Sequence, residues 1–266
     1  MAARTGIVDD VNDEIEQPTE LYWDDVVDVI CAGTGPGVLA QAIVCIDLGL
    51  SVELAETVAP SGLSDPDTVA YLEAMTEDLG TLDPSSAGLE LPVVHAAPVA
   101  PRTDRRTRIE PFVGSRLRDW SARCMVSPFG VIYSGIPEAG VTAMRSDSGE
   151  SIRAAVLGPY RPDADRPGAA LADWLAEQAW ERDVAGHGLG LQRLIFEWGR
   201  VAGAAIDAAS GTRLIRARAG VALSTGAVPV GATWPVQPEL RDVVAQVAIV
   251  GRTGSRFGRV ELLFET

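Results

Sequence analysis

The stretch Val27–Glu56, VDVICAGTGPGVLAQAIVCIDLGLSVELAE, contains the pattern that decides the fold. An apolar run ends at a glycine turn, a helical pattern follows from about Pro36 to Leu48, and a second apolar run begins at Ser51. Short apolar runs predict buried strands, and proline at the first helical position with Gly49 after the last favours a helix between them. Two strands joined in this way are expected to pair in parallel through a right-handed crossover.

From Asp28 to Glu56 the chain resembles the amino-terminal unit of FAD-dependent oxidoreductases, most closely the fumarate reductase and 3-ketosteroid dehydrogenase group. That group has an aspartate, an apolar run, the pattern G-x-G-x-x-G-x-A and, about twenty residues later, an acid. The positions that fit without a gap are Asp28, Gly33, Gly35, Ala40, Gly49, Val52 and Glu56. The resemblance implies an α/β fold, with a Rossmann-like FAD/NAD-binding βαβ unit and an α+β cap or substrate portion.

The resemblance also implies a role for each residue of the turn. Gly33 allows the tight turn out of the strand, and Gly35 lets the backbone approach the cofactor pyrophosphate. The helix start at Pro36 and Gly37 presents N–H groups and the positive end of the helix dipole to that anion. Glu56 accepts hydrogen bonds from the adenosine ribose. We therefore expect these five residues to bind FAD.

Departures from the pattern fall where the flavin would bind. Val38 replaces the third glycine, where helix and strand pack closely, and overpacking there costs about 1–3 kcal/mol unless the backbone shifts. Only Pro60–Leu63 stands where the group has a glycine- and serine-rich segment that lines the isoalloxazine ring. No late glycine-rich segment that would cap the flavin precedes Thr266, and members of the group are longer. We expect a truncated and partly degenerate member.

The rest of the chain predicts alternating helices and strands. Helices are expected at residues 64–79, 114–124, 169–181 and 191–209, and strands at 91–96, 130–136, 141–145, 151–157, 212–218, 221–225, 243–250 and 259–264. The predicted organisation is an acidic, flexible head at 1–24, a nucleotide-binding-like βαβ portion at 25–96, an α+β cap-like portion at 97–185 and a return to the nucleotide-binding-like portion at 186–266.

Composition excludes several classes of function. The net charge of −15 disfavours nucleic acid and anionic membranes as partners. All 22 basic residues are arginine, which excludes a Schiff-base lysine and the lysine of a P-loop. Cys31, Cys45 and Cys124 are far apart and form no C-x-x-C pair, which disfavours metal ligation, and Cys31 and Cys45 are predicted to be small core residues. Without a signal peptide or a membrane-spanning apolar run, the cytoplasm is the expected location.

Dehydrogenation beside a flavin needs a base and a group that holds a carbonyl or carboxylate. Tyr133 in an apolar strand, Tyr160 in a loop beside an arginine, and His187 between two glycines are the candidate catalytic residues. The arginines Arg102, Arg105, Arg106 and Arg108 predict a solvated loop, or a site for a carboxylate or an acidic partner surface. None of these residues completes a known catalytic motif.

The sequence therefore leaves two functions open and favours a third less. The first is an FAD-binding oxidoreductase, a dehydrogenase or reductase of a small or steroid-like substrate, with an incomplete flavin site. The second is a catalytically inactive pseudoenzyme derived from a flavoprotein, which acts as a binding or assembly subunit with a protein partner or a second copy of itself. The third is an NAD-binding enzyme that uses the same turn.

Overall fold

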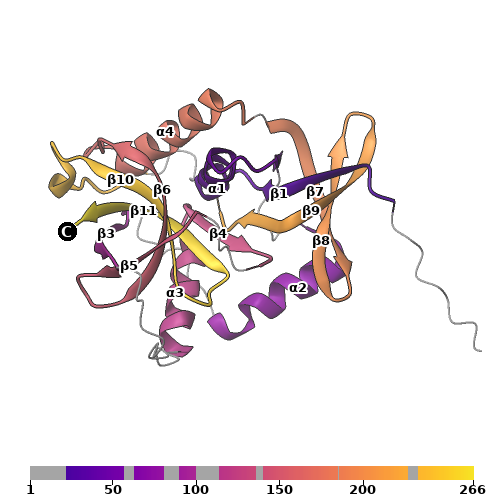
Figure 1. Ribbon diagram of the computed structural model, residues 1–266, viewed down its shortest axis with the longest axis horizontal. Coiled ribbons are helices and arrows are strands. Elements are labelled where there is room, and N and C mark those ends of the chain that lie inside the picture. The colour runs from indigo at the N-terminus through magenta and orange to yellow at the C-terminus, as the bar shows by residue number, and fades with distance from the viewer. Residues whose placement is uncertain are drawn as a thin grey trace, which may run out of the picture.

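The computed structural model describes residues 22–56, 63–80, 90–99, 114–135, 140–184, 186–226 and 233–266, without the side chains of Glu56 and of residues 186–189. Within these ranges the chain is a strand-rich mixed α/β protein, as predicted (Figure 1). Its helices are α1 (Pro36–Asp47), α2 (Pro66–Thr76), α3 (Gly114–Val126) and α4 (Pro167–Glu181). Its strands are β1 (Asp25–Ala32), β2 (Val52–Glu56), β3 (Val93–Pro98), β4 (Gly130–Tyr133), β5 (Thr142–Ser146), β6 (Ser151–Tyr160), β7 (Gly186–Glu197), β8 (Arg200–Ala208), β9 (Gly211–Ser224), β10 (Ala245–Gly251) and β11 (Phe257–Glu265).

The strands form two closed circuits that share no strand. In the first, β1 pairs with β2 and β9, and β7 and β8 complete the circuit between them. In the second, β3 pairs with β5 and β11, and β6 and β10 complete it. The short strand β4 joins the circuits because it pairs with both β9 and β11. Closure leaves few unpaired strand edges open to other chains.

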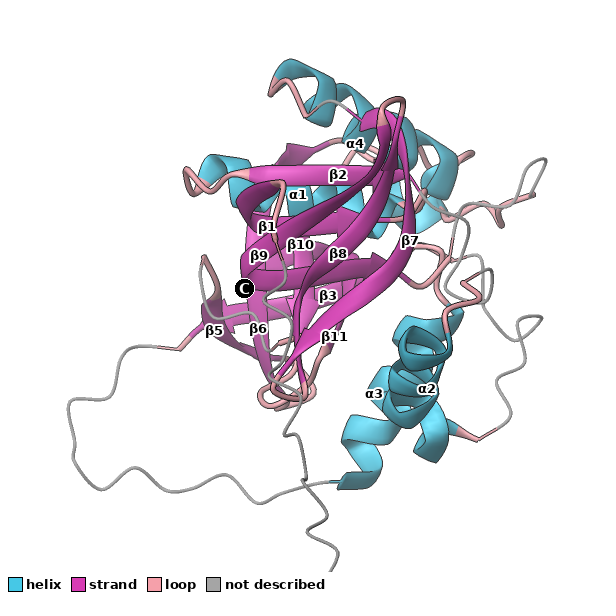
Figure 2. Cartoon of the chain, turned by 90° about the vertical axis from the view of Figure 1, so that its right-hand side faces the viewer, coloured by secondary structure: helices cyan, strands magenta, loops and turns pink. Residues whose placement is uncertain are grey.

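Two hydrophobic cores lie on opposite faces of this sheet. Side chains alternate between the faces along a strand, so Cys31 belongs to the core under α1 and α4 while Ile30 belongs to the core over α2 and α3. α4 contributes Leu171 to the first core, and α3 contributes Trp120 to the second. Figure 2 shows the same division, with α1 and α4 together and α2 and α3 together.

The first βαβ unit agrees with its sequence pattern. β1 and β2 pair in parallel, with Val29 opposite Val52 and Ala32 opposite Ala55. α1 begins at Pro36, which occupies the first helical position, and the chain leaves the helix through Gly49 at a φ of +73°. The parallel pairing expected of this segment is therefore confirmed.

The helix predicted over residues 191–209 is wrong, because this segment forms the β7–β8 hairpin. Phe196 pairs with Val201 and Glu197 with Arg200, so only Trp198 and Gly199 lie between the strands. Both turn residues have positive φ, +52° and +71°, as a two-residue hairpin turn requires. Tertiary pairing with β2 and β9 overrides the helical spacing of the apolar residues.

The strands predicted at 212–218 and 221–225 form one strand, β9, which continues through Gly220 at a φ of +129°. Its pairing with β1 shifts register at this glycine, between Val27 and Val29, so the predicted break is a bulge. The predicted division of the chain into portions that end at residues 96 and 185 stays a prediction. Residues 1–21 of the acidic head and the arginines of 102–108 lie outside the described residues, whereas Asp24 is held to β9 because its carboxylate accepts from the Leu214 N–H at 2.7 Å.

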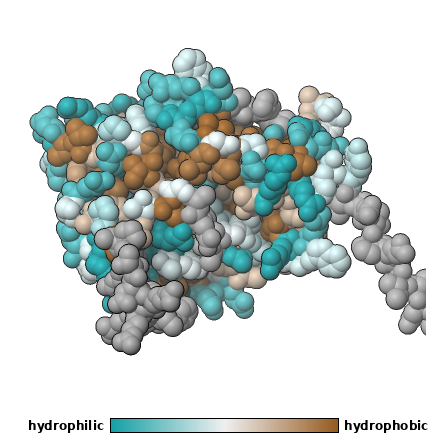
Figure 3. All heavy atoms as spheres, viewed as in Figure 1, coloured by the Kyte–Doolittle hydropathy of each residue, from teal (hydrophilic) through white to brown (hydrophobic). Residues whose placement is uncertain are grey.

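The surface and the helices add two observations. In the view of Figure 1, apolar residues gather over the region of α1, below α4 (Figure 3). Among the helices that the structure describes, none is long and apolar enough to cross a membrane.

Candidate functional site

The Gly33 turn lies at the carboxyl ends of three parallel strands. β1 pairs in parallel with β2 on one side and with β9 on the other, so the carboxyl ends of these strands lie at the same edge. The Gly33 N–H donates to Ala55 O at 2.9 Å, which fixes the turn to the end of β2. In nucleotide-binding βαβ units, phosphate groups bind at the N-terminus of the helix that follows such a turn.

The helix that follows the turn begins without a side-chain cap. Gly35 is the N-cap residue of α1, with extended backbone and no side-chain hydrogen bond to the first turn. The first N–H groups of a helix have no partner within it, and they carry the positive end of the helix dipole. Thr34 is exposed, whereas Gly33, Gly35, Pro36 and Gly37 are buried. Thr34 is therefore the exposed residue next to the start of α1.

The carboxyl end of β9 packs directly against the turn. A Cβ atom built on Gly33 would overlap Ser224, and one built on Gly35 would overlap Ser224 Oγ and Gly226 O. Ser224 Oγ in turn donates a hydrogen bond to Gly226 O. Both glycines are thus required by the close approach of the protein's own chain, on the side of the turn that faces β9.

A second segment closes the site from the start of β4. Thr225 Oγ1 lies 3.0 Å from both Cys124 O and Ser127 O, and the Thr225 N–H donates to Gly130 O at 3.2 Å. A Cβ on Gly37 would meet the carbonyl oxygens of residues 129 and 130. The first turn of α1 therefore packs against backbone on this side as well.

Val38, which replaces the third glycine of the motif, is fully buried in the core under α1 and α4. α1 nevertheless begins at Pro36 and packs on β1 and β9. The uncapped start of α1, next to the exposed Thr34, suits the charge of a pyrophosphate. The residues at the turn leave no room for one between Gly35 and Ser224, where the protein's own atoms lie.

Two residues predicted for the site lie on neighbouring strands. Glu56 is the last residue of β2, and its backbone pairs with Gly190 of β7. His187 lies on β7, between Gly186, which pairs with Leu54, and Gly190. The structure thus places the backbones of Glu56 and His187 on adjacent strands, while both side chains lie outside the described part of the chain.

Asp28, the first residue of the sequence pattern, fastens β1 to the start of β2. Its carboxylate accepts from the Ser51 N–H at 2.9 Å and from Ser51 Oγ at 2.8 Å, and Arg218 lies 3.3 Å away. The Ser51 hydrogen bonds, followed by Arg218, lower the pKa of Asp28. Asp28 lies near the start of β1, so it holds the strands together rather than contacting a ligand at the turn.

The two candidate tyrosines lie in the core. Tyr133 is 6% exposed, and its hydroxyl donates to Gln41 Oε1 of α1 at 2.9 Å. Tyr160 packs on Trp174 of α4, with ring centroids 5.4 Å apart. Burial raises the pKa of Tyr133 far above its ordinary value and that of Tyr160 to about 12. Both hydroxyls therefore stay protonated near neutral pH.

Cys31 and Cys45 are buried core residues, as predicted, Cys124 is buried as well, and burial raises the pKa of each thiol. No group of histidine, cysteine and carboxylate side chains suited to a metal ion occurs among the described residues.

Sequence reasoning missed the partners of the turn on the opposite strand, namely Ser224, Thr225 and Gly226. Their local signal is a serine, a threonine and a glycine directly after the buried run at the end of β9. This signal predicts a contact with the turn only when the pairing of Ala32 with Leu223 is known, because that pairing places Ser224 beside Gly33.

No family model and no curated protein matches this chain. Similar solved structures include a 3-ketosteroid-Δ4-(5α)-dehydrogenase from Rhodococcus jostii, 20% identical over 77% of this chain and 47% of that chain, with a TM-score of 0.34. A flavocytochrome c3 fumarate reductase in an open conformation is 14% identical over 76% and 34%, with a TM-score of 0.32. A myxobacterial chondrochloren halogenase, a variant of FAD-dependent halogenases, is 19% identical over 73% and 36%, with a TM-score of 0.28.

This chain spans about a third to a half of the length of these three proteins. Likeness at these identities and TM-scores carries no argument about cofactor or substrate. We therefore argue function from the geometry of the Gly33 turn.

Proposed function

We propose that this chain binds the ADP half of FAD at the Gly33 turn and belongs to the FAD-dependent oxidoreductases. One observation supports the proposal above the others. The N-terminus of α1, without a side-chain cap, lies at the carboxyl ends of the parallel strands β1, β2 and β9. Free N–H groups and a positive dipole end at such a point bind phosphate groups.

Each residue of the turn then has a definite task. Gly33 turns the chain out of β1 at a φ of +135°, and Thr34 offers an exposed hydroxyl beside the helix start. Pro36 and Gly37 begin the helix whose N–H groups face the pyrophosphate. Glu56, at the end of the adjacent strand, accepts hydrogen bonds from the ribose. When bound, the flavin supplies hydride transfer.

The proposed substrate is a small or steroid-like molecule. A base that acts near neutral pH needs a pKa close to that pH. The raised pKa values of Tyr133 and Tyr160 leave these residues as hydrogen-bond donors rather than bases. Histidine is the side-chain type whose ordinary pKa lies near neutrality, so we assign the proton transfer to His187, the third catalytic candidate.

A second function, favoured by a different observation, is that of a flavoprotein-derived subunit without a flavin. Ser224 Oγ and Gly226 O lie against Gly35, and Val38 is fully buried, so the protein's own atoms take up one side of the turn. Such a subunit binds a protein partner or a second copy of itself. It predicts protein that stays colourless with FAD and co-purifies with that partner.

The Glu56 carboxylate gives a direct test of the flavin proposal. Titration of the purified chain with FAD, followed by flavin fluorescence, measures the affinity, and NAD serves as the competing ligand. Loss of a hydrogen bond from an ionised group corresponds to about 1.5–3 kcal/mol, so Glu56→Gln weakens FAD about tenfold or more. The matched control is Glu265→Gln, the exposed last residue of β11, which leaves the affinity unchanged. Displacement of FAD by NAD would instead favour the nicotinamide alternative.

A further inference from the structure

An open pocket lies between the carboxyl-terminal end of α3 and the segment that leads into β3. Its volume is about 430 Å³, within the range of small-molecule sites. Its wall combines apolar residues with charges of both signs, and the charged lining residues are Glu90, Arg123, Glu239 and Arg259. None of the lining residues belongs to the Gly33 turn, so this pocket is a site of its own.

Gln237 joins the two segments that carry the carboxylates of this pocket. Its side chain accepts from the Leu91 N–H at 2.9 Å and donates to Leu91 O at 3.1 Å, and the residue is 7% exposed. Glu90 directly precedes Leu91, and Glu239 lies in the short helix η4 (Pro238–Leu240), which begins directly after Gln237. The two hydrogen bonds therefore hold the backbones of Glu90 and Glu239 next to each other, and these residues form the acidic part of the wall.

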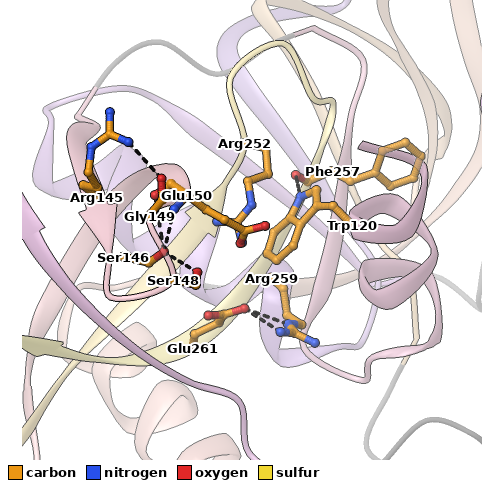
Figure 4. Close-up of polar contacts among 10 residues, drawn as sticks. All are labelled: Trp120, Arg145, Ser146, Ser148, Gly149, Glu150, Arg252, Phe257, Arg259 and Glu261. Atoms are coloured by element: carbon orange, nitrogen blue, oxygen red, sulfur yellow. Dashed lines mark hydrogen bonds and ion pairs between the residues drawn. The ribbon is translucent and has the colours of Figure 1, made fainter. Parts of the chain in front are cut away.

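The basic part of the wall comes from α3 and β11. The guanidinium carbons of Arg123 and Arg259 lie 5.6 and 5.5 Å from the centroid of the Trp120 ring. Arg259 is neutralised by Glu261, with Nη2 2.6 Å from Oε1, and Figure 4 shows these two side chains together next to Trp120. Arg123 is exposed and has no ion pair among the residues that the structure describes. Arg123 therefore supplies the positive charge that a ligand can use.

The pocket leaves charges of both signs for a ligand. Like Arg123, Glu90 and Glu239 are exposed and have no ion pair within the described ranges of the chain. No ion pair holds these three head groups elsewhere, so they are free to contact a molecule in the pocket. Val93, which is 37% exposed, and the half-buried Val126 add apolar surface to the wall. A matching ligand carries an ammonium group, a carboxylate and an apolar body.

We propose that this pocket binds a small zwitterion of the class of apolar α-amino acids. The carboxylate of the ligand lies at Arg123, its ammonium group at Glu90 and Glu239, and its side chain against Val93 and Val126. Hydrogen bonds between ionised partners are stronger than those between neutral groups, and the apolar side chain leaves water where it covers the valines. Binding at this pocket needs no flavin, so its test is independent of the flavin proposal.

Titration of the full chain with leucine, followed by ligand-observed NMR, tests the proposal. Two analogues of leucine separate the two charged contacts. N-acetylleucine lacks the ammonium group and keeps the carboxylate, whereas leucinamide lacks the carboxylate and keeps the ammonium group. We expect saturable binding of leucine, with weaker binding of both analogues.

Variants of the two charged parts of the wall then assign each contact. Arg123→Gln weakens leucine and N-acetylleucine about fivefold, as expected for an exposed ion pair, and leaves leucinamide unchanged. Glu239→Gln weakens leucine and leucinamide to a similar extent and leaves N-acetylleucine unchanged. The controls Arg118→Gln in α3 and Glu177→Gln in α4 change exposed residues outside the pocket, so the affinity for all three ligands stays the same.

The four substituted residues are exposed, so we expect every variant to fold and the comparison to be complete. Opposite responses of N-acetylleucine and leucinamide to Arg123→Gln and Glu239→Gln support the zwitterion site. The proposal is overturned if leucine does not bind, if the wild type binds all three ligands equally, or if Arg123→Gln and Arg118→Gln bind them alike.

Discussion

The Ser224 side chain lies against Gly35, in the space that a side chain on Gly35 would need. This relationship joins two segments far apart in the sequence, the turn after β1 and the end of β9. It arises because β1 and β9 pair in parallel up to Ala32 and Leu223. The glycine pattern of the turn thus serves the packing of the fold on the side that faces β9.

Gly35→Ala is expected to destabilise the protein. The new methyl group overlaps Ser224 Oγ and Gly226 O, and overpacking of this kind costs about 1–3 kcal/mol. Denaturant unfolding measures the change. The matched control is Gly135→Ala, because a Cβ at Gly135 meets no atom within 4 Å. Equal stability of the two variants would contradict the close contact at the turn.

Asp28→Asn is expected to lower stability near neutral pH and to lose this effect in acid. The pKa of Asp28 is lowered in the folded state, so its carboxylate contributes stability above the ordinary aspartate pKa of about 4. That contribution disappears as the pH falls from there through the lowered pKa. Unfolding curves across this range, with the exposed turn residue Asp147→Asn as control, measure the difference. A difference in unfolding free energy between wild type and Asp28→Asn that stays constant down to the lowest pH would argue against the hydrogen bonds from Ser51 to the Asp28 carboxylate.

Thr68→Val is expected to loosen α2 from the hairpin. The Thr68 hydroxyl accepts from the Leu194 N–H of β7 at 2.9 Å and donates to Asp65 Oδ2 at 2.7 Å. Valine keeps the shape but leaves a buried N–H without an acceptor, at a cost of about 1–3 kcal/mol. In the control Thr76→Val, the lost hydroxyl bonds reach only carbonyls of its own helix. The rate of hydrogen exchange at the Leu194 amide should rise in Thr68→Val and not in Thr76→Val. Slow exchange of this amide in both variants would refute the contact between Thr68 and Leu194.

Trp198→Asn is expected to stabilise the hairpin. Trp198 is 93% exposed and has a φ of +52°, a conformation that asparagine adopts more readily than tryptophan. The expected gain in unfolding free energy is about 1 kcal/mol. Trp180→Asn, at an exposed helical position of α4, controls for the loss of a surface tryptophan. Destabilisation by Trp198→Asn would mean that the indole has a partner that compensates for its strained backbone.

The first βαβ unit was predictable because its signals are local. Proline and glycine mark the ends of α1, and the apolar runs mark β1 and β2. The β7–β8 hairpin was missed because its apolar residues also fit helical spacing. Gly199 and Gly203 within the predicted helix were contrary signals. In the structure, Gly203 lies so close to Ile215 O and Trp23 that no Cβ fits.

The same distinction holds for the site. Gly33, Gly35 and the helix start follow from neighbouring residues, so the sequence predicts them. The roles of Ser224 and Thr225 depend on contacts between distant segments, with Gly35 for the first and with Cys124 O and Ser127 O for the second. Such contacts are set by strand pairing, which one sequence does not reveal.

A visible absorption spectrum of the purified chain, taken after incubation with FAD and removal of unbound cofactor, tests the central claim most directly. We predict flavin bands at close to one FAD per chain, with lower occupancy in Glu56→Gln and full occupancy in Glu265→Gln. A colourless protein that remains correctly folded after the same treatment would contradict FAD binding at the Gly33 turn.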